Sequence, residues 1–149
     1  MANRTLEQLN DERDIVRALS QFARILDTKD WPRLREVFDV DVSFDYGGGQ
    51  VGQGLGALTD NMRKYLDLCG GTQHLVGSLL VDVDDDLATS RAYVQARHQR
   101  RGDAGGPIFD STGEYIDRWA RRPNGWRIVR RDAHWFAQFG DAAIIGFGA

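Results

Sequence analysis

The sequence predicts an α+β fold, in which helices come first and pack on one face of a largely antiparallel sheet. Apolar residues recur at helical spacing in the first half of the chain. From residue 72 onward, apolar and polar residues alternate, as in strands that bury one face. Turn signals, among them Asn124-Gly125, join these strands into a meander. Long twisted strands that are covered on one side only curl into a cone, and the mouth of such a cone is a natural ligand pocket.

The first helix begins after Thr5, which forms a capping-box pattern with Gln8. Its apolar stripe consists of Leu9, Ile15, Leu19, Phe22 and Leu26. Asp27 falls at the C-terminal end, where a carboxylate meets the negative end of the helix dipole. This misfit raises the question of a second role for Asp27, although a solvent-facing terminus explains the position as well.

Two further helices flank a short hairpin. Asp30 suits the N-cap of a short helix that starts with Trp31-Pro32, and a half-buried strand follows at residues 42–46. A turn at residues 47–49 leads to a short return strand at residues 50–53. The third helix begins after Gly54, carries an apolar face as far as Cys69, and is expected to end at Gly70-Gly71.

Four strands are predicted after these helices, at residues 72–83, 87–100, 111–122 and 126–139. Residues 142–149 form a small apolar tail that needs a surface to cover. Neither repeats nor an internal linker interrupt the chain. We therefore predict a single domain over residues 1–149, with a core at about residues 5–141 and a C-terminal tail at 142–149.

Composition excludes several classes of protein. The 149 residues carry a net charge of −3, so nucleic acid is a poor candidate partner. Arginines cluster from Arg118 to Arg131, but Asp117 and Asp132 lie among them, which favours solvated strand faces. A single cysteine permits neither a disulfide framework nor a zinc motif. No segment resembles a signal peptide or is apolar enough to span a membrane, so a cytoplasmic setting and no membrane partner are expected.

His74 is the leading candidate for chemistry. It lies near the head of a predicted strand, on a face shared with Val76, Ser78 and Leu80. An imidazole there is either a satisfied core group or a base that faces a cavity. His98 follows Val94 and Ala96 at alternate positions, but the polar residues around it also fit a half-exposed side chain.

Five short motifs then occur in a familiar order. They are Leu26-Asp27-Thr28-Lys29-Asp30-Trp31, Phe44-Asp45-Tyr46, Thr72-Gln73-His74 with Gly77, Arg97-His98-Gln99-Arg100, and Gly125-Trp126-Arg127. From Ile15 to Asp141 the chain resembles the SnoaL-like branch of the nuclear-transport-factor-2-like superfamily, and its scytalone dehydratase-like members most of all. The resemblance implies a cystatin-like α+β barrel, a cone-shaped curved mixed or antiparallel sheet with the N-terminal helices on its concave face. Relatives form dimers or trimers, so a homodimer or homotrimer is expected.

The resemblance also assigns roles to residues. Asp27 and His74 match the aspartate–histidine base, His98 matches the family's second histidine, and Tyr46 matches one of two pocket tyrosines. The chain departs from the family at Leu26, where the other tyrosine stands. The family's pocket asparagine falls near Ile116, or at Tyr115 if the alignment slips by one residue. We expect Leu26, Ile116, Phe136 and Phe139 to shape the substrate pocket together with the C-terminal tail.

The implied reaction is dehydration next to a carbonyl, without a cofactor or a metal ion. His74 would remove the proton α to the carbonyl, and Asp27 would fix its tautomer. Tyr46 would stabilise the oxyanion, and His98 would bind and protonate the leaving hydroxyl. The side chains of Asp27, His74, His98 and Glu114 could in principle hold a metal. No short-range ligand spacing supports such a site.

Two other functions remain open from the sequence. The same dyad would serve an isomerase, a cyclase or a dehydrohalogenase that acts on an apolar ring. Alternatively, the domain binds a small hydrophobic or aromatic molecule without catalysis. Tyr93, Trp119 and Trp135 are predicted to lie on the outer face of the sheet, where they could join subunits.

Overall fold

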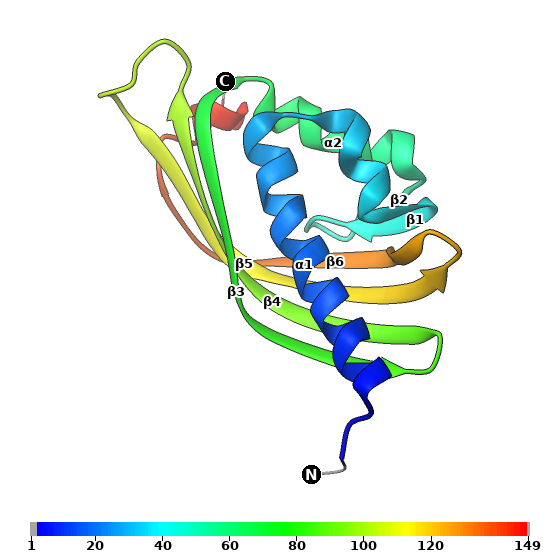
Figure 1. Cartoon of the computed structure of the whole chain (residues 1–149). Coiled ribbons are helices and arrows are strands. Elements are labelled where there is room, and N and C mark those ends of the chain that lie inside the picture. The colour runs from blue at the N-terminus through cyan, green and yellow to red at the C-terminus, as the bar shows by residue number, and fades with distance from the viewer. Residues whose placement is uncertain (1–2, 149) are drawn as a thin grey trace.

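A six-stranded curved sheet forms the frame of the molecule in the computed structural model, which describes residues 3–148 (Figure 1). The strand order is β2-β1-β6-β5-β4-β3. The elements are α1 (Leu6–Thr28), the 3₁₀ helix η1 (Trp31–Glu36), β1 (Phe38–Asp45), β2 (Gly52–Gln53), α2 (Leu55–Leu66), β3 (Cys69–Asp84), β4 (Leu87–Arg100), β5 (Ile108–Arg122), β6 (Gly125–Gly140) and the 3₁₀ helix η2 (Ala142–Ile145). Strands β3 to β6 form the predicted antiparallel meander, whereas β1 pairs with β6 in parallel.

The predicted α+β class and the curved mixed sheet are therefore confirmed. In Figure 1 the strands sweep through an arc, and α1 crosses its inner side with α2 above it. The outermost strands, β2 and β3, do not pair with each other, so the sheet remains open. The main core lies between α1 and the concave face, where Phe22, Leu26, Val42, Val94 and Trp119 are buried.

Helix α1 starts and stops where its capping residues require. Both hydrogen bonds of the Thr5–Gln8 capping box are present. At the other end Lys29 adopts a left-handed conformation with φ 54° and donates its backbone N–H to Leu26 O. The side chain of Lys29 also donates to the carbonyl oxygen of Cys69 at 2.7 Å, which ties the end of α1 to the start of β3.

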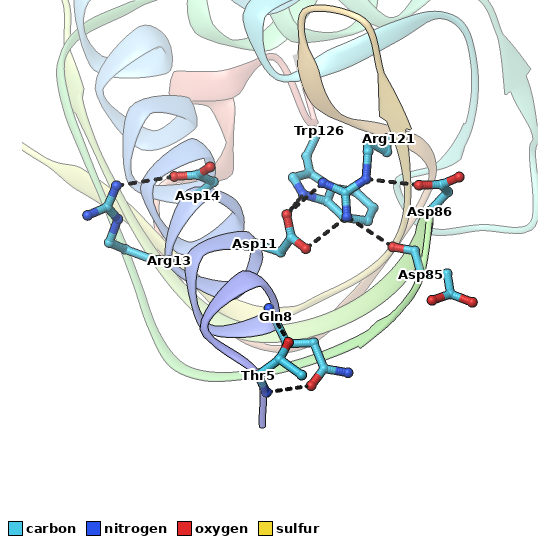
Figure 2. A network of polar contacts seen from close by, with 9 residues as sticks. All are labelled: Thr5, Gln8, Asp11, Arg13, Asp14, Asp85, Asp86, Arg121 and Trp126. Carbon is cyan, nitrogen blue, oxygen red and sulfur yellow. Dashed lines mark hydrogen bonds and ion pairs between the residues drawn. The ribbon is translucent and has the colours of Figure 1, made fainter. Parts of the chain in front are cut away.

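A polar network pins the N-terminal half of α1 to the sheet (Figure 2). Asp11 is buried and accepts two hydrogen bonds from the Arg121 guanidinium, at 2.7 and 2.8 Å. The indole nitrogen of Trp126 donates to the same carboxylate at 3.0 Å, and Arg121 reaches Asp86 at 2.9 Å. The network ties α1 to the sheet at the end of the helix remote from Asp27.

The third helix is shorter than the sequence predicts. It ends at Leu66, and Cys69, Gly70 and Gly71 already belong to β3. A side chain at Gly70 would place its Cβ 3.0 Å from the carbonyl oxygen of Arg100. The glycine therefore permits close approach of β3 to the end of β4, and it is not a helix stop.

Strand β3 changes face near its middle. Its register with β4 shifts between Gly77 and Leu80, where Ser78 has φ 48°. Such a bulge inserts an extra residue and moves the following side chains to the opposite face. Leu79 and Val81 consequently pack in the core, while Leu80 is 66% exposed, contrary to the predicted alternation with His74.

The apolar tail packs against β4 and β5. Ile144 and Ile145 of η2 are buried in a second small cluster with Cys69 and Phe109. Phe147 stacks on Tyr65 of α2 with 5.4 Å between ring centroids. Ala149, the last residue of the predicted tail, lies outside the described residues, as do Met1 and Ala2 of the predicted domain. None of the described helices combines the length and the apolar character needed to cross a membrane.

Candidate active site

Asp27 and His74 form a hydrogen-bonded pair. Nδ1 of His74 lies 2.7 Å from Oδ1 of Asp27, and because a carboxylate only accepts, Nδ1 carries the proton. Among residues 3–148, every fully buried side-chain nitrogen or oxygen has a hydrogen-bond partner. His74 has a side-chain partner at Nδ1 alone, so Nε2 is accessible, and His74 lines the principal cavity. With its proton on Nδ1, the neutral form of the ring would present an unprotonated Nε2 to that cavity.

Two neighbouring elements bring the pair together. Asp27 comes from the last turn of α1, and His74 comes from the first half of β3, which packs along that helix. The backbone N–H of His74 donates to Oδ2 of Asp27 at 3.0 Å. Thr72, two residues earlier on the same side of β3, donates its hydroxyl to Oδ1 at 3.0 Å. The carboxylate is therefore held by three donors from one strand.

This environment keeps Asp27 ionised. Burial alone would raise the pKa of its carboxyl, but the hydrogen bonds from the ring and backbone of His74 and from Thr72 hold the pKa below its ordinary value. An ionised Asp27 fixes the His74 tautomer with its proton on Nδ1, and it stabilises the imidazolium that forms when Nε2 accepts a proton. The otherwise unfavourable place of Asp27 at a helix C-terminus is offset by these donors.

His98 lies beside His74 and is also buried. The two imidazole rings meet edge to face with 5.7 Å between centroids. Nδ1 of His98 lies 2.9 Å from the carbonyl oxygen of Phe109 and must donate to it. Burial lowers the pKa of His98, although the carbonyl partly opposes this effect. His98 is therefore a neutral ring whose Nε2 can accept a hydrogen bond, because it too lines the cavity.

The cavity that these two histidines line has a volume of about 750 Å³, within the range of small-molecule sites. Its wall is mostly apolar. The lining includes Leu26, Phe44, Tyr46, Met62, Tyr65, Leu66, His74, Ala96, His98, Phe109, Ser111, Tyr115, Trp135, Gln138, Ile145 and Phe147. Helix α2, the concave sheet face and the tail therefore enclose one pocket around the dyad.

The structure brings together most of the residues predicted to be catalytic. His74, His98 and Tyr46 line the cavity, and Asp27 stands directly behind His74. Of the four predicted substrate-binding residues, only Leu26 is among the residues that line it. Ile116 follows Tyr115 on β5 and so faces the outer side of the sheet, and Phe136 and Phe139 are 61% and 75% exposed.

A bulge explains the misplacement of Phe136. The register between β5 and β6 shifts between Arg118 and Trp119, where β6 has one extra residue. The inner face of β6 therefore passes from Ile128 to Arg131 and Ala133, and Phe136 falls on the outer face. Trp135 turns inward, lines the cavity and donates its indole N–H to the Tyr46 carbonyl at 2.9 Å. Trp119 is also inside, where it donates to Ser90 at 2.8 Å. Of the three aromatic residues predicted on the outer face, only Tyr93 is exposed.

A buried ion pair is not expected from the sequence. Asp117 and Arg131, which the sequence assigns to solvated strand faces, are both 0% exposed. Nε and Nη2 of Arg131 each lie 2.7 Å from a carboxylate oxygen of Asp117. The period-two pattern Ser111, Gly113, Tyr115, Asp117, Trp119 on β5 would have indicated that Tyr115 and Asp117 share the inner face.

Metal ligation finds no support in these side chains. Among residues 3–148, no three or more histidine, cysteine, aspartate or glutamate side chains are grouped to hold an ion. Glu114, which the sequence allows as a conceivable ligand with the histidines, instead accepts two hydrogen bonds from Arg91 at 2.8 and 3.0 Å. His134 is exposed and lies near Asp132 and Asp45 in a separate shallow pocket.

Comparison with known proteins agrees with this architecture. Residues 7–132 match the SnoaL-like domain, and the chain belongs to that family. It is 28% identical over 135 residues to the uncharacterised protein Rv2910c of Mycobacterium tuberculosis, a match that covers 85% of this chain and 86% of that protein.

Solved structures with the same fold have low sequence identity. A protein of Novosphingobium aromaticivorans provisionally described as a scytalone dehydratase has a TM-score of 0.79 at 22% identity, covering 88% of this chain and 87% of that chain. An NTF2-like protein with a cystatin-like fold from the same organism has a TM-score of 0.74 at 23% identity, covering 93% and 89%. Hexachlorocyclohexane dehydrochlorinase LinA-type3 of Novosphingobium barchaimii has a TM-score of 0.78 at 16% identity, covering 92% and 94%. The resemblance to SnoaL-like proteins is thus confirmed, and the NTF2-like neighbour has the same fold.

Proposed function

We propose that this protein is a cofactor-independent lyase that eliminates water from a small hydrophobic or aromatic substrate. The proposal depends mainly on one observation, the 2.7 Å contact between Asp27 and His74 with Nε2 of His74 open to an apolar cavity. A positioned base of this kind typically contributes ~10²–10⁴ in rate. The family and the scytalone dehydratase-like neighbour are compatible with this reaction class.

The proposed reaction begins when Nε2 of His74 removes a proton from the carbon α to a carbonyl group. The electron pair of the C–H bond moves into the carbonyl, and the resulting oxyanion accepts a hydrogen bond from the Tyr46 hydroxyl. The carbon–oxygen bond of the neighbouring hydroxyl then breaks as a carbon–carbon double bond forms. The proton held by the His74 imidazolium returns to the departing oxygen, so one water molecule leaves and neutral His74 is regenerated.

His98 has a narrower role in this scheme than its sequence motif suggests. Because its Nδ1–H is committed to the Phe109 carbonyl, neutral His98 offers only an acceptor at Nε2. Burial lowers its pKa and thus disfavours the imidazolium that would be needed for an acid. We therefore assign His98 to orienting the leaving hydroxyl, whose hydrogen it accepts.

A second candidate is an isomerase, cyclase or dehydrohalogenase that uses the same base on an apolar ring. The predominantly apolar wall of the cavity favours it, because a halogenated or polycyclic ring needs few polar partners. A product profile that shows rearrangement, or loss of halide without loss of water, would select this candidate.

Proton exchange tests the base without knowledge of the natural substrate. 1-Tetralone is an aromatic ketone with exchangeable α-protons and no leaving group, and its exchange in D₂O is followed by NMR. The wild-type protein is expected to accelerate exchange over buffer, and His74→Ala and Asp27→Asn are expected to abolish most of the acceleration. His134→Ala is the matched control, because it removes an exposed imidazole outside the cavity.

Two outcomes would contradict the proposal. If His74→Ala exchanged 1-tetralone as fast as wild type, His74 would not be the base. If 1-tetralone bound and was returned without any exchange, a non-catalytic binding domain would be favoured. The predicted homodimer or homotrimer is tested separately by light scattering on the purified protein, and the cytoplasmic setting by cell fractionation.

A further inference from the structure

An ion pair lies behind two tyrosines of the cavity wall and makes no contact with the dyad that would explain it. Asp117 and Arg131 are completely buried, and neither lines the cavity. Burying two charges costs several kcal/mol per ion, and apolar residues of similar volume often replace such a pair without loss of stability. Their presence directly beneath two cavity tyrosines therefore calls for an explanation beyond packing.

Arg131 has one nitrogen left after binding Asp117. Its Nε and Nη2 bind the carboxylate, and Nη1 lies 3.3 Å from the hydroxyl oxygen of Tyr46. The guanidinium is held in place by aromatic rings, with 4.0 Å to the centroid of Tyr115 and 4.4 Å to that of Phe22. Asp117 thus orients the guanidinium, and the rings prevent it from turning away.

The hydrogen bond between Arg131 and Tyr46 has only one possible donor. A guanidinium has no acceptor, so Nη1 donates and the Tyr46 oxygen accepts. The proton of the Tyr46 hydroxyl must then point away from Arg131, and Tyr46 lines the cavity. A hydroxyl that accepts from a cation also becomes a stronger donor, because the cation draws electron density from the oxygen. Burial raises the pKa of the Tyr46 hydroxyl, and the positive charge of Arg131 partly opposes this rise. This opposing effect comes from the same attraction between the cation and the hydroxyl oxygen.

We propose that Arg131, oriented by Asp117, is a positioning residue that directs the Tyr46 hydroxyl into the cavity as the donor for a substrate oxyanion. The inference deepens the proposed function, because it names the group that prepares the oxyanion donor. Arg131 need not touch the substrate. Tyr115 has a hydroxyl at the cavity wall without a partner among the described residues, so it serves as a comparison that lacks this preparation.

Binding of 4-nitrophenolate tests the inference without turnover. This coloured aromatic oxyanion is compared at a pH above its own pKa with 4-nitrotoluene, a neutral molecule of similar shape. The variant Asp117→Leu/Arg131→Met removes the pair without changing net charge. We expect it to weaken phenolate binding by about tenfold or more, as for loss of a charge-assisted hydrogen bond, while 4-nitrotoluene affinity stays within about twofold.

A mutant cycle distinguishes positioning from packing. Adding Tyr46→Phe to the double variant should cause no further loss of phenolate affinity beyond that of Tyr46→Phe alone, because Arg131 acts through that hydroxyl. Adding Tyr115→Phe to the double variant should instead lower phenolate affinity further, by the same factor as Tyr115→Phe alone. Arg97→Gln/Asp110→Asn is the matched control, because it removes an exposed pair with the same bidentate geometry, at 2.9 and 2.7 Å.

Several results would overturn the inference. They are an equal loss for both ligands, an unchanged phenolate affinity, or a loss that multiplies with that of Tyr46→Phe. If the double variant fails to fold, Arg131→Lys replaces it, because an ammonium keeps the charge but cannot reproduce the planar fork that holds Asp117 and Tyr46 together. It should lose phenolate affinity selectively. Retained phenolate selectivity with no proton exchange would refute the lyase and leave this inference standing.

Discussion

Replacing Asp27 with asparagine tests the reasoning about the dyad most directly. The carboxylate accepts three hydrogen bonds, from Nδ1 and the backbone N–H of His74 and from Thr72. The backbone donor cannot move, so the amide oxygen of the new asparagine must take the place of Oδ2. The amide NH₂ then faces Nδ1 of His74, which has to accept, and the ring proton moves to Nε2.

The expected loss in the rate of proton exchange follows from this tautomer of His74. A ring protonated on Nε2 cannot remove a proton from a molecule in the cavity, so exchange should fall by ~10²–10⁴. The Thr72 hydroxyl can rotate to accept from the new NH₂ group. The fold should therefore survive, with a loss of about 1–3 kcal/mol in the free energy of unfolding as charge-assisted hydrogen bonds become neutral.

Nitrogen-15 NMR of the histidine rings measures the tautomer directly, in parallel with proton exchange. Wild type should show His74 protonated on Nδ1, and Asp27→Asn should show it protonated on Nε2. Asp14→Asn, an exposed change on the same helix, should alter neither observable. An Asp27→Asn protein that kept the Nδ1 proton and the exchange rate of wild type would refute the role given to Asp27.

Three further predictions concern stability. Burial lowers the pKa of His98 below its ordinary value of 6.5, so the unfolded chain binds the proton more readily and stability should fall as the pH drops below that value. Urea unfolding between about pH 5 and 7 should show a shallower dependence on pH in His98→Gln than in wild type. Asp11→Ala leaves the buried Trp126 indole and Nη1 of Arg121 without their acceptor, and it should cost about 1–3 kcal/mol in the same assay, whereas Asp14→Ala should cost little. Gly113→Ala would bring a Cβ into steric conflict with the carbonyl oxygen of His134, so a loss of about 1–3 kcal/mol is expected, and wild-type stability would contradict the close approach of β5 to β6.

The sequence predicts an element correctly where the signal lies in a few adjacent residues. The Thr5 capping box, the Asn124-Gly125 turn and the alternation of β4 each depend on a few adjacent residues, and the structure has all three. Asp27 and His74 can be identified together because their short motifs occur in family order. Their hydrogen bond follows because the end of α1 and the start of β3 lie side by side.

Prediction from the sequence fails where the position of a side chain depends on the register of a neighbouring strand. Nothing local marks the bulges that displace Leu80 and Phe136, because a bulge is set by the register of the neighbouring strand. The sequence favours exposure of Asp117 and Arg131, since charged side chains are seldom fully buried. Only the β5–β6 register places one opposite the other on the inner face, where their charges compensate.

The two ends of the chain differ in their distance from the chemistry. The beginning of α1 is anchored by the Asp11 network, far from the dyad, while Ile145 and Phe147 near the other end form part of the pocket wall. An affinity tag or a fluorescent label is therefore better placed on the amino terminus. Conversely, exchanging the last few residues offers protein engineers a way to resize the pocket for larger or smaller rings without altering the base.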